Sequence, residues 1–174
     1  MDETEKHTVD ALFVKMVLLA WQTQNNEVNK LLEMLSDEQL SKETAPGRNT
    51  GVYLLGHLAS INDNLFKILN LGERLHPDLD PIFLDNREDL KVARPSIDAL
   101  KKYWNEINEK LTDRFNSMQP SDWFSRHMSV SEEDFLKEPH RNKLNVIMNR
   151  TAHQSYHLGQ MAYLKKDEAA SSVT

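Results

Sequence analysis

Apolar residues recur along this chain with the 3.6-residue period of an α-helix in four separate stretches, and no stretch alternates convincingly with period two. The first stretch covers about residues 8–35. The second begins at an N-cap, Asn49 or Thr50, and stops at Gly72. In the first, the residues expected to face inward are Val9, Leu12, Phe13, Met16, Ala20, Leu31 and Met34.

The two remaining stretches lie in the second half of the chain. One follows Pro95 and Ser96 and ends before Pro120. The other starts near Asn142 and has apolar residues on two sides, which predicts that two of its faces are buried. Because glycine is scarce and the predicted helices are long enough to lie side by side, the pattern predicts an all-α protein, an antiparallel four-helix bundle.

A long segment, residues 73–96, separates the second and third predicted helices. It is interrupted by proline but carries Leu79, Ile82, Phe83 and Leu84, so we expect an ordered crossover that packs on the bundle. Before the last helix, Ser131 is expected to cap a short helix. The length predicts that residues 1–174 form a single domain with an ordered core from about 8 to 166.

Composition narrows the classes of partner. The 174-residue chain has a formal net charge of −6, so we do not expect nucleic acid or an anionic membrane as a partner. It contains no cysteine, which excludes disulfides, thiolate metal sites and a cysteine nucleophile. The start of the chain is acidic and polar, and no apolar run approaches the length of a membrane span. A cytoplasmic protein is the resulting expectation.

Two histidines have the spacing of metal ligands. His153 and His157, in the segment HQSYHLGQ, lie one turn apart on one face of a helix. A divalent ion such as Zn²⁺ needs at least a third protein ligand, and His57 in YLLGHLASI is the candidate. All three flank apolar stripes, where imidazoles without partners are costly to desolvate, so a shared ion explains them best. If His57 is not the third ligand, His127 or His140 is the next candidate.

Other catalytic patterns fit the chain poorly. A single Glu-x-x-His match, Glu73 to His76, follows a helix-ending glycine, which argues against a di-iron bundle. There is no His-Glu-x-x-His motif, no Gly-rich phosphate loop and no nucleophilic serine elbow. Glu27 falls within the first predicted apolar stripe. We weigh two roles for it: a glutamate whose side chain reaches solvent, or a general base or acceptor that orients a ligand imidazole.

His57 within GHL and the segment HQSYHLGQ together resemble the DinB-like superfamily, which includes the YfiT-type proteins. Its members are four-helix bundles with a histidine on the second helix and an H-x-x-x-H pair on the fourth, commonly followed by Gly-Gln. The resemblance covers most of the chain in helix order and length, and implies that His57, His153 and His157 form a metal triad. Gly159 and Gln160 match the end of the motif. Gly159 would permit close helix approach, and Gln160 would contact the site or only cap packing.

The resemblance also implies chemistry on a small molecule, because some relatives are implicated in metal-dependent transfer of low-molecular-weight thiols or in thiol-assisted isomerisation of a small diacid. We expect a metal-dependent enzyme of the thiol (S-)transferase or hydrolase kind, with a low-molecular-weight thiol as cosubstrate in the first case. The alternative is a non-catalytic, metal-containing bundle that binds a small ligand or a protein partner. The ion is expected to be zinc, nickel or iron, with copper also compatible.

The fourth predicted helix carries more apolar surface than one neighbour in a bundle covers. Its second apolar side predicts a homodimer formed by helix-to-helix packing. The residues of that side are Leu144, Met148, Leu158 and Ala162.

Overall fold

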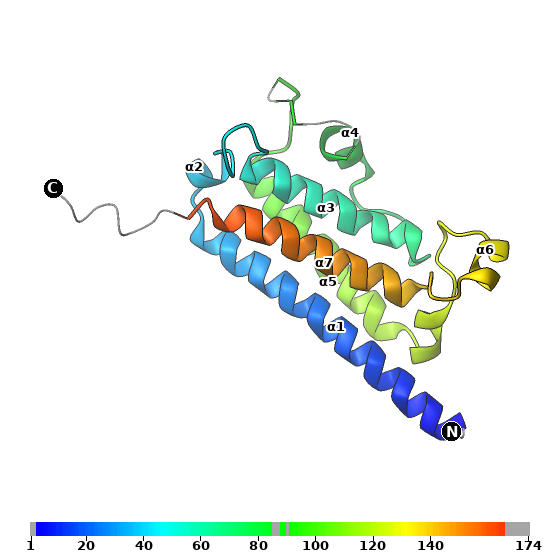
Figure 1. Ribbon diagram of the computed structural model, residues 1–174. Coiled ribbons are helices and arrows are strands. Elements are labelled where there is room, and N and C mark those ends of the chain that lie inside the picture. Colours follow the sequence, from blue (N-terminus) through cyan, green and yellow to red (C-terminus); the bar gives the residue numbers. More distant parts are fainter. Residues whose placement is uncertain (1–2, 85–87, 90, 166–174) are drawn as a thin grey trace.

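The computed structural model describes residues 3–84, 88–89 and 91–165 (Figure 1), so residue 166 and the tail that follows it lie outside the described residues. The described residues are all-α and contain no β-strand, which confirms the expected fold class. The bundle is formed by α1 (Glu3–Met34), α3 (Gly51–Ile68), α5 (Ile97–Ser117) and α7 (Lys143–Ala162). Shorter elements lie in the connections: α2 (Asp37–Leu40), η1 (Pro77–Leu79), α4 (Asp80–Phe83), η2 (Pro120–Phe124) and α6 (Glu132–Lys137).

Four helices begin at polar residues that lie at or next to the helix starts expected from the sequence. The side chains of Thr50, Ser96, Ser131 and Asn142 each accept a hydrogen bond from the backbone N–H three residues later. At its other end, α3 stops before the predicted Gly72. Asn70 adopts a left-handed φ of 56°, and the N–H of Leu71 donates to the carbonyl of Phe66 at 2.8 Å, which closes the helix earlier.

The crossover between α3 and α5 decides how the helices run (Figure 1). It returns the chain to the end of the bundle where α3 begins, so α3 and α5 are parallel, and α1 and α7 are parallel too. Side-chain hydrogen bonds agree with this register, joining Asn62 to Asn108 and Asn25 to Gln154, both at 2.9 Å. The antiparallel arrangement therefore applies to α1 with α5 and to α3 with α7.

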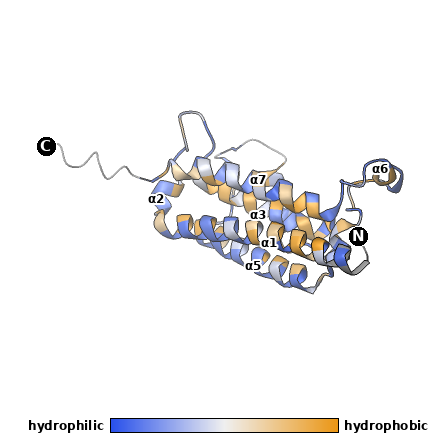
Figure 2. Ribbon diagram, turned by 60° about the horizontal axis from the view of Figure 1, so that its bottom comes forward, coloured by the Kyte–Doolittle hydropathy of each residue, from blue (hydrophilic) through white to orange (hydrophobic). Residues whose placement is uncertain are grey.

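The inward face of α1 differs from the predicted one. Of the predicted stripe only Leu31 is buried, whereas Leu12 and Met16 are each 58% exposed. Hydrophobic residues lie along the N-terminal part of α1 on more than one side (Figure 2), so the period alone does not select the buried face. The true face includes polar Asn25, which weakens its apolar signal. The apolar residues of that face are Val14, Val17, Trp21, Val28, Leu31 and Leu32, and Leu35 directly after α1 is buried as well.

The apolar side of α7 that motivated a homodimer is largely covered within the chain. Leu144 is only 2% exposed and Leu158 packs against the core. Only Met148 and Ala162 remain exposed. The reason is that α7 contacts α1, α3 and η2, so more than one neighbour covers its apolar surface. The burial of Leu144 and the packing of Leu158 against the core therefore remove the reason for placing a dimer interface on this face of α7.

Buried amide side chains connect the four long helices. Asn62 on α3 donates to Asn108 on α5 at 2.9 Å and to Gln154 on α7 at 3.4 Å. Gln154 in turn donates to Asn25 on α1 at 2.9 Å. Because buried amides need their partners, these bonds favour one register of α3 against α7.

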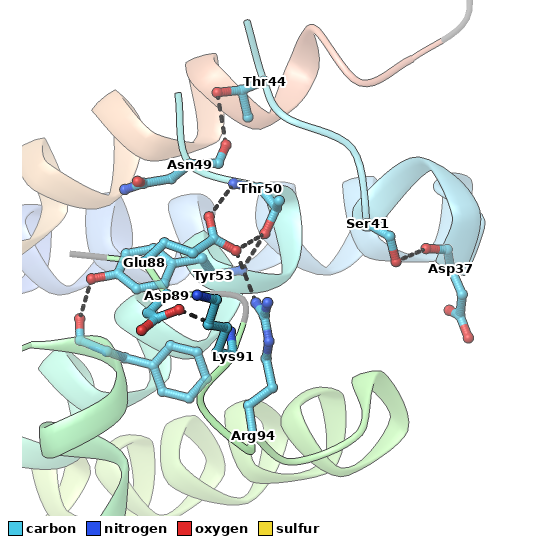
Figure 3. A network of polar contacts seen from close by, with 11 residues as sticks. Asp37, Ser41, Thr44, Asn49, Thr50, Tyr53, Glu88, Asp89, Lys91 and Arg94 are labelled. Atoms are coloured by element: carbon cyan, nitrogen blue, oxygen red, sulfur yellow. Dashed lines mark hydrogen bonds and ion pairs between the residues drawn. The ribbon is translucent and has the colours of Figure 1, made fainter. Parts of the chain in front are cut away.

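The crossover is attached to the bundle at both of its ends. Near its start, the fully buried carboxylate of Asp63 accepts hydrogen bonds from Arg74 Nε at 3.0 Å and from the backbone N–H of Leu75 at 2.8 Å. Near its end, Glu88 accepts from the N–H of Thr50 at 2.7 Å and from Arg94 at 2.9 Å (Figure 3). Between these points Leu79 and Phe83 are fully buried, as predicted for an ordered crossover. Within the described residues, no helix combines the length and hydropathy needed to cross a membrane.

Candidate metal centre

The three predicted histidines lie together where α3 meets α7. His153 Nε2 is 3.0 Å from His157 Nε2 and 3.5 Å from His57 Nε2. All three offer a ligand nitrogen within 4.8 Å of the others. Over the part of the chain that the structure describes, no other group of three or more histidine, aspartate or glutamate side chains gathers in this way. His127 and His140 lie outside this cluster.

His57 is oriented by the crossover. Its Nδ1 lies 2.9 Å from the carbonyl oxygen of Phe83, and the hydroxyl of Tyr53 donates to the same oxygen at 3.3 Å. A carbonyl only accepts, so Nδ1 carries the proton and the lone pair of Nε2 points into the cluster. Gly56 makes this arrangement possible, because a Cβ at that position would overlap the ring of Phe83.

His157 is oriented from within its own helix. Its Nδ1 lies 2.7 Å from Oε1 of Gln160, three residues later, so Nδ1–H donates and Nε2 again has a free lone pair. The Nε2 amide of Gln160 donates to the hydroxyl of Tyr156 at 3.2 Å, which holds the amide in this orientation. Acceptors of this kind commonly orient metal-ligating imidazoles.

His153 shows that the cluster is short of partners. Its Nδ1 is buried and has no hydrogen-bond partner. If its proton is on Nε2, it can donate to only one of the two neighbouring lone pairs, and Nδ1 stays unsatisfied. If the proton is on Nδ1, that donor is unsatisfied and three lone pairs face one another. In this second case, a cation between the three Nε2 atoms would give all three lone pairs a partner.

The spacing of the nitrogens fits a metal ion. Ligands at Zn–N distances of about 2.0–2.1 Å in a tetrahedron are about 3.3 Å apart. The observed separations of 3.0 and 3.5 Å bracket this value. Three imidazoles also match the ligand set of catalytic sites that keep one position open. The three ligand nitrogens are therefore arranged as a group that could hold a metal ion.

The surroundings keep the imidazoles neutral, as metal ligation requires. Burial lowers the pKa of His57. Burial, followed by the charge of His57, lowers the pKa of His157. Burial, followed by the charges of His157, His57 and Arg150, lowers the pKa of His153 to about 4. Protons therefore compete poorly for these nitrogens at neutral pH.

For Glu27, the structure agrees with the first of the two roles weighed above, a side chain that reaches solvent. Glu27 is exposed, and its carboxylate accepts from Lys30 Nζ at 2.7 Å, because Trp21, Asn25 and Val28 take the inward positions of α1. The orienting acceptors are the Phe83 carbonyl and Gln160 instead. Gly159 does not serve close helix approach, since a Cβ there would meet nothing within 4 Å.

A family model described as the DinB superfamily matches residues 20–161. The chain belongs to the DinB superfamily. The match includes all three histidines and Gln160, and it confirms the resemblance that the two histidine motifs indicate. A comparison with curated proteins finds no match.

The sequence did not reveal the Phe83 carbonyl as part of this DinB site. A backbone acceptor supplied by a crossover leaves no side-chain pattern, because any residue has a carbonyl. One indirect signal exists: Gly56 stands directly before His57 inside a helix, where glycine is disfavoured. Such a glycine indicates that another segment approaches the helix closely.

Proposed function

We propose that His57, His153 and His157 together bind one divalent metal ion, and that this DinB protein is a metal-dependent enzyme acting on a small molecule. The reaction we favour is thiol (S-)transfer, with hydrolysis as the other form of the same proposal. The observation that carries it is the convergence of three Nε2 atoms, two of which have their protons held away by Phe83 and Gln160.

When bound, such an ion lowers the pKa of a thiol or water molecule that contacts it, and so supplies a nucleophile at neutral pH. Because the chain contains no cysteine, the thiol would be a low-molecular-weight cosubstrate. Gln160 acts here as a positioning residue through His157, and the Phe83 carbonyl acts in the same way through His57. Three neutral imidazoles suit zinc, nickel or iron, so the ligand set alone does not choose among them.

The alternative is a metal-containing bundle that binds a small ligand or partner without turnover. The two functions differ in whether a small molecule can reach the ion. Cobalt(II) is a suitable probe, because its visible spectrum changes when a thiol joins its ligands. An enzyme of the proposed kind should show this change with small thiols, and a closed structural site should not.

The proposed function is tested by mixing small thiols with electrophilic acceptors in the presence of the zinc-, nickel- or iron-loaded protein. We expect loss of free thiol that requires the metal and disappears in His153→Ala. The exposed His140→Ala serves as the matched control and should keep full activity. Absence of both turnover and a thiol-dependent cobalt spectrum would count against thiol transfer at this site.

A further inference from the structure

Arg150 is a half-buried cation beside the histidine cluster. It stands three residues before His153 and seven before His157, so the three side chains follow one face of α7. Its Nε is buried and has no hydrogen-bond partner. Buried guanidinium groups normally have their N–H donors in hydrogen bonds, so the Nε–H of Arg150 lacks an acceptor.

The two helices that carry the histidines offer no unpaired carboxylate to Arg150. The α7 sequence contains neither aspartate nor glutamate, and α3 contains only Asp63. The Asp63 carboxylate is already occupied by Arg74 and by the backbone N–H groups of Leu75 and His76. Among the ion pairs of the described residues, none involves Arg150. The two helices that carry the histidines therefore supply no counter-charge for this guanidinium.

The charge of Arg150 reaches the histidine cluster. Arg150 stands about one helical turn from His153 on the same face of α7, so its positive charge lies close to the histidine cluster. With a divalent ion on the three histidines, two cationic groups would lie near one another without a counter-charge. An anionic group positioned between them would balance both.

We propose that Arg150 binds a carboxylate of the small molecule that the site accepts, so that the substrate class is a small organic acid or a carboxylate-bearing thiol. This inference rests on the proposed function for its view of the neighbouring ion. The planar guanidinium fork matches a carboxylate in two parallel hydrogen bonds. The reactive end of the molecule then faces the histidines while its carboxylate is held one helical turn away.

The remaining half-buried positions suit the carbon skeleton of such a molecule. On α3, Ile61 and Asn64 follow His57 by four and seven residues, and on α7, Val146 precedes Arg150 by four. In the antiparallel register that places His57 against His153, both rows extend from the histidines towards Arg150. They offer apolar surface and one amide beside the charged groups.

The test uses 3-mercaptopropionate and its uncharged match, 3-mercaptopropanamide, with the full-length protein. In the metal-free protein, the Nε–H resonance of Arg150 is followed by NMR, and it should shift saturably with the carboxylate but not with the amide. In the cobalt-loaded protein, the thiolate-to-cobalt absorption band should show the carboxylate binding about tenfold more tightly or better than the amide.

Variants of Arg150 separate charge from structure. Arg150→Met should remove the preference for the carboxylate, and Arg150→Lys should keep part of it, because lysine retains the charge without the fork. Lys143→Met, at the start of the same helix, is the matched control and should keep the full preference. An unchanged preference in Arg150→Met, or an Nε–H resonance that ignores both compounds, would overturn the proposal.

The two readouts also separate this proposal from the proposed function. A carboxylate-dependent Nε–H shift without any cobalt band for either thiol would support Arg150 as the anion site and count against thiol chemistry at the metal. A cobalt band that shows equal affinity for both compounds would support thiol chemistry at the metal and count against Arg150 as the anion site.

Discussion

In two of the three imidazoles of the cluster, a single neighbouring acceptor decides which ring nitrogen carries the proton. Phe83 and Gln160 hold the Nδ1 protons of His57 and His157, and nothing holds that of His153. The sequence could predict the three histidines, because ligand spacing on a helix and burial on an apolar stripe are both visible in it. It could not predict the acceptors, since one is a backbone carbonyl and the other depends on side-chain orientation.

Gln160 offers the most direct test at this scale. Gln160→Leu removes the acceptor for His157 Nδ1–H, so the imidazole loses its fixed tautomer, and we expect zinc affinity to fall by about 10–100-fold. Gln160→Glu keeps an acceptor and should stay close to the native affinity. Competition with a zinc chelator measures both. Equal affinities for the leucine variant and the native protein would contradict the positioning role.

The lowered histidine pKa values predict how the metal-free protein responds to acid. Below about pH 6.5 the unfolded chain binds protons that the folded cluster resists, so unfolding becomes easier as the pH falls towards the folded pKa of His153, about 4. Urea unfolding in the presence of a chelator should show this loss of stability. The loss should be smaller in His153→Gln than in the exposed His140→Gln. Identical pH dependence in the two variants would contradict it.

At the level of helices, the sequence predicts where a helix begins better than which of its faces is buried. The caps at Ser96, Ser131 and Asn142 act through local side-chain-to-backbone bonds, which short sequence patterns capture. The buried face of α1 depends on which neighbours cover it. The exposed Leu12 and Met16 have the same period as the buried Val14 and Trp21, so the pattern permits either face.

The same substitution to alanine at Gly56 on α3 and at Gly159 on α7 should have opposite effects on stability. Gly56→Ala should destabilise the protein and weaken metal binding, because the new Cβ displaces the Phe83 ring and with it the carbonyl that orients His57. Gly159→Ala places its Cβ in open space on an exposed helical position, and should raise stability by up to about 1 kcal/mol. Thermal unfolding and zinc titration of both variants check this. A Gly56→Ala protein with native zinc affinity would show that Phe83 does not control His57.

At the level of the whole molecule, the all-α bundle followed from the helix count, but the direction of each helix did not. Whether α5 runs parallel to α3 depends on where the crossover ends, and that is fixed by contacts such as Glu88 with Thr50 and Arg94. These contacts join residues far apart in the chain. The register that brings His57 to His153 depends in part on buried amides, whose partners no local pattern reveals.

The homodimer stays a prediction, now with another surface. The exposed large apolar side chains of α1 include Val9, Leu12, Phe13, Met16 and Leu19, between 45% and 58% exposed, in a row longer than isolated proteins usually leave bare. We expect a second copy to cover this row. Light scattering should give a dimeric mass for the native protein and a monomeric mass for Leu12→Lys/Met16→Lys. A change at Met34, exposed at the other end of α1, is the control and should leave the dimer intact. A native monomer at micromolar concentration would exclude this assembly.

The central claim, one ion shared by three histidines from two helices, is tested most directly by zinc content. The native protein, purified without a nickel column and equilibrated with zinc, should hold about one ion per chain. His57→Ala, His153→Ala and His157→Ala should each lose most of it to a similar extent and keep their helical circular dichroism, because the core does not depend on the ion. Full zinc occupancy in His57→Ala beside loss in the other two, or a native protein without zinc, would contradict the account.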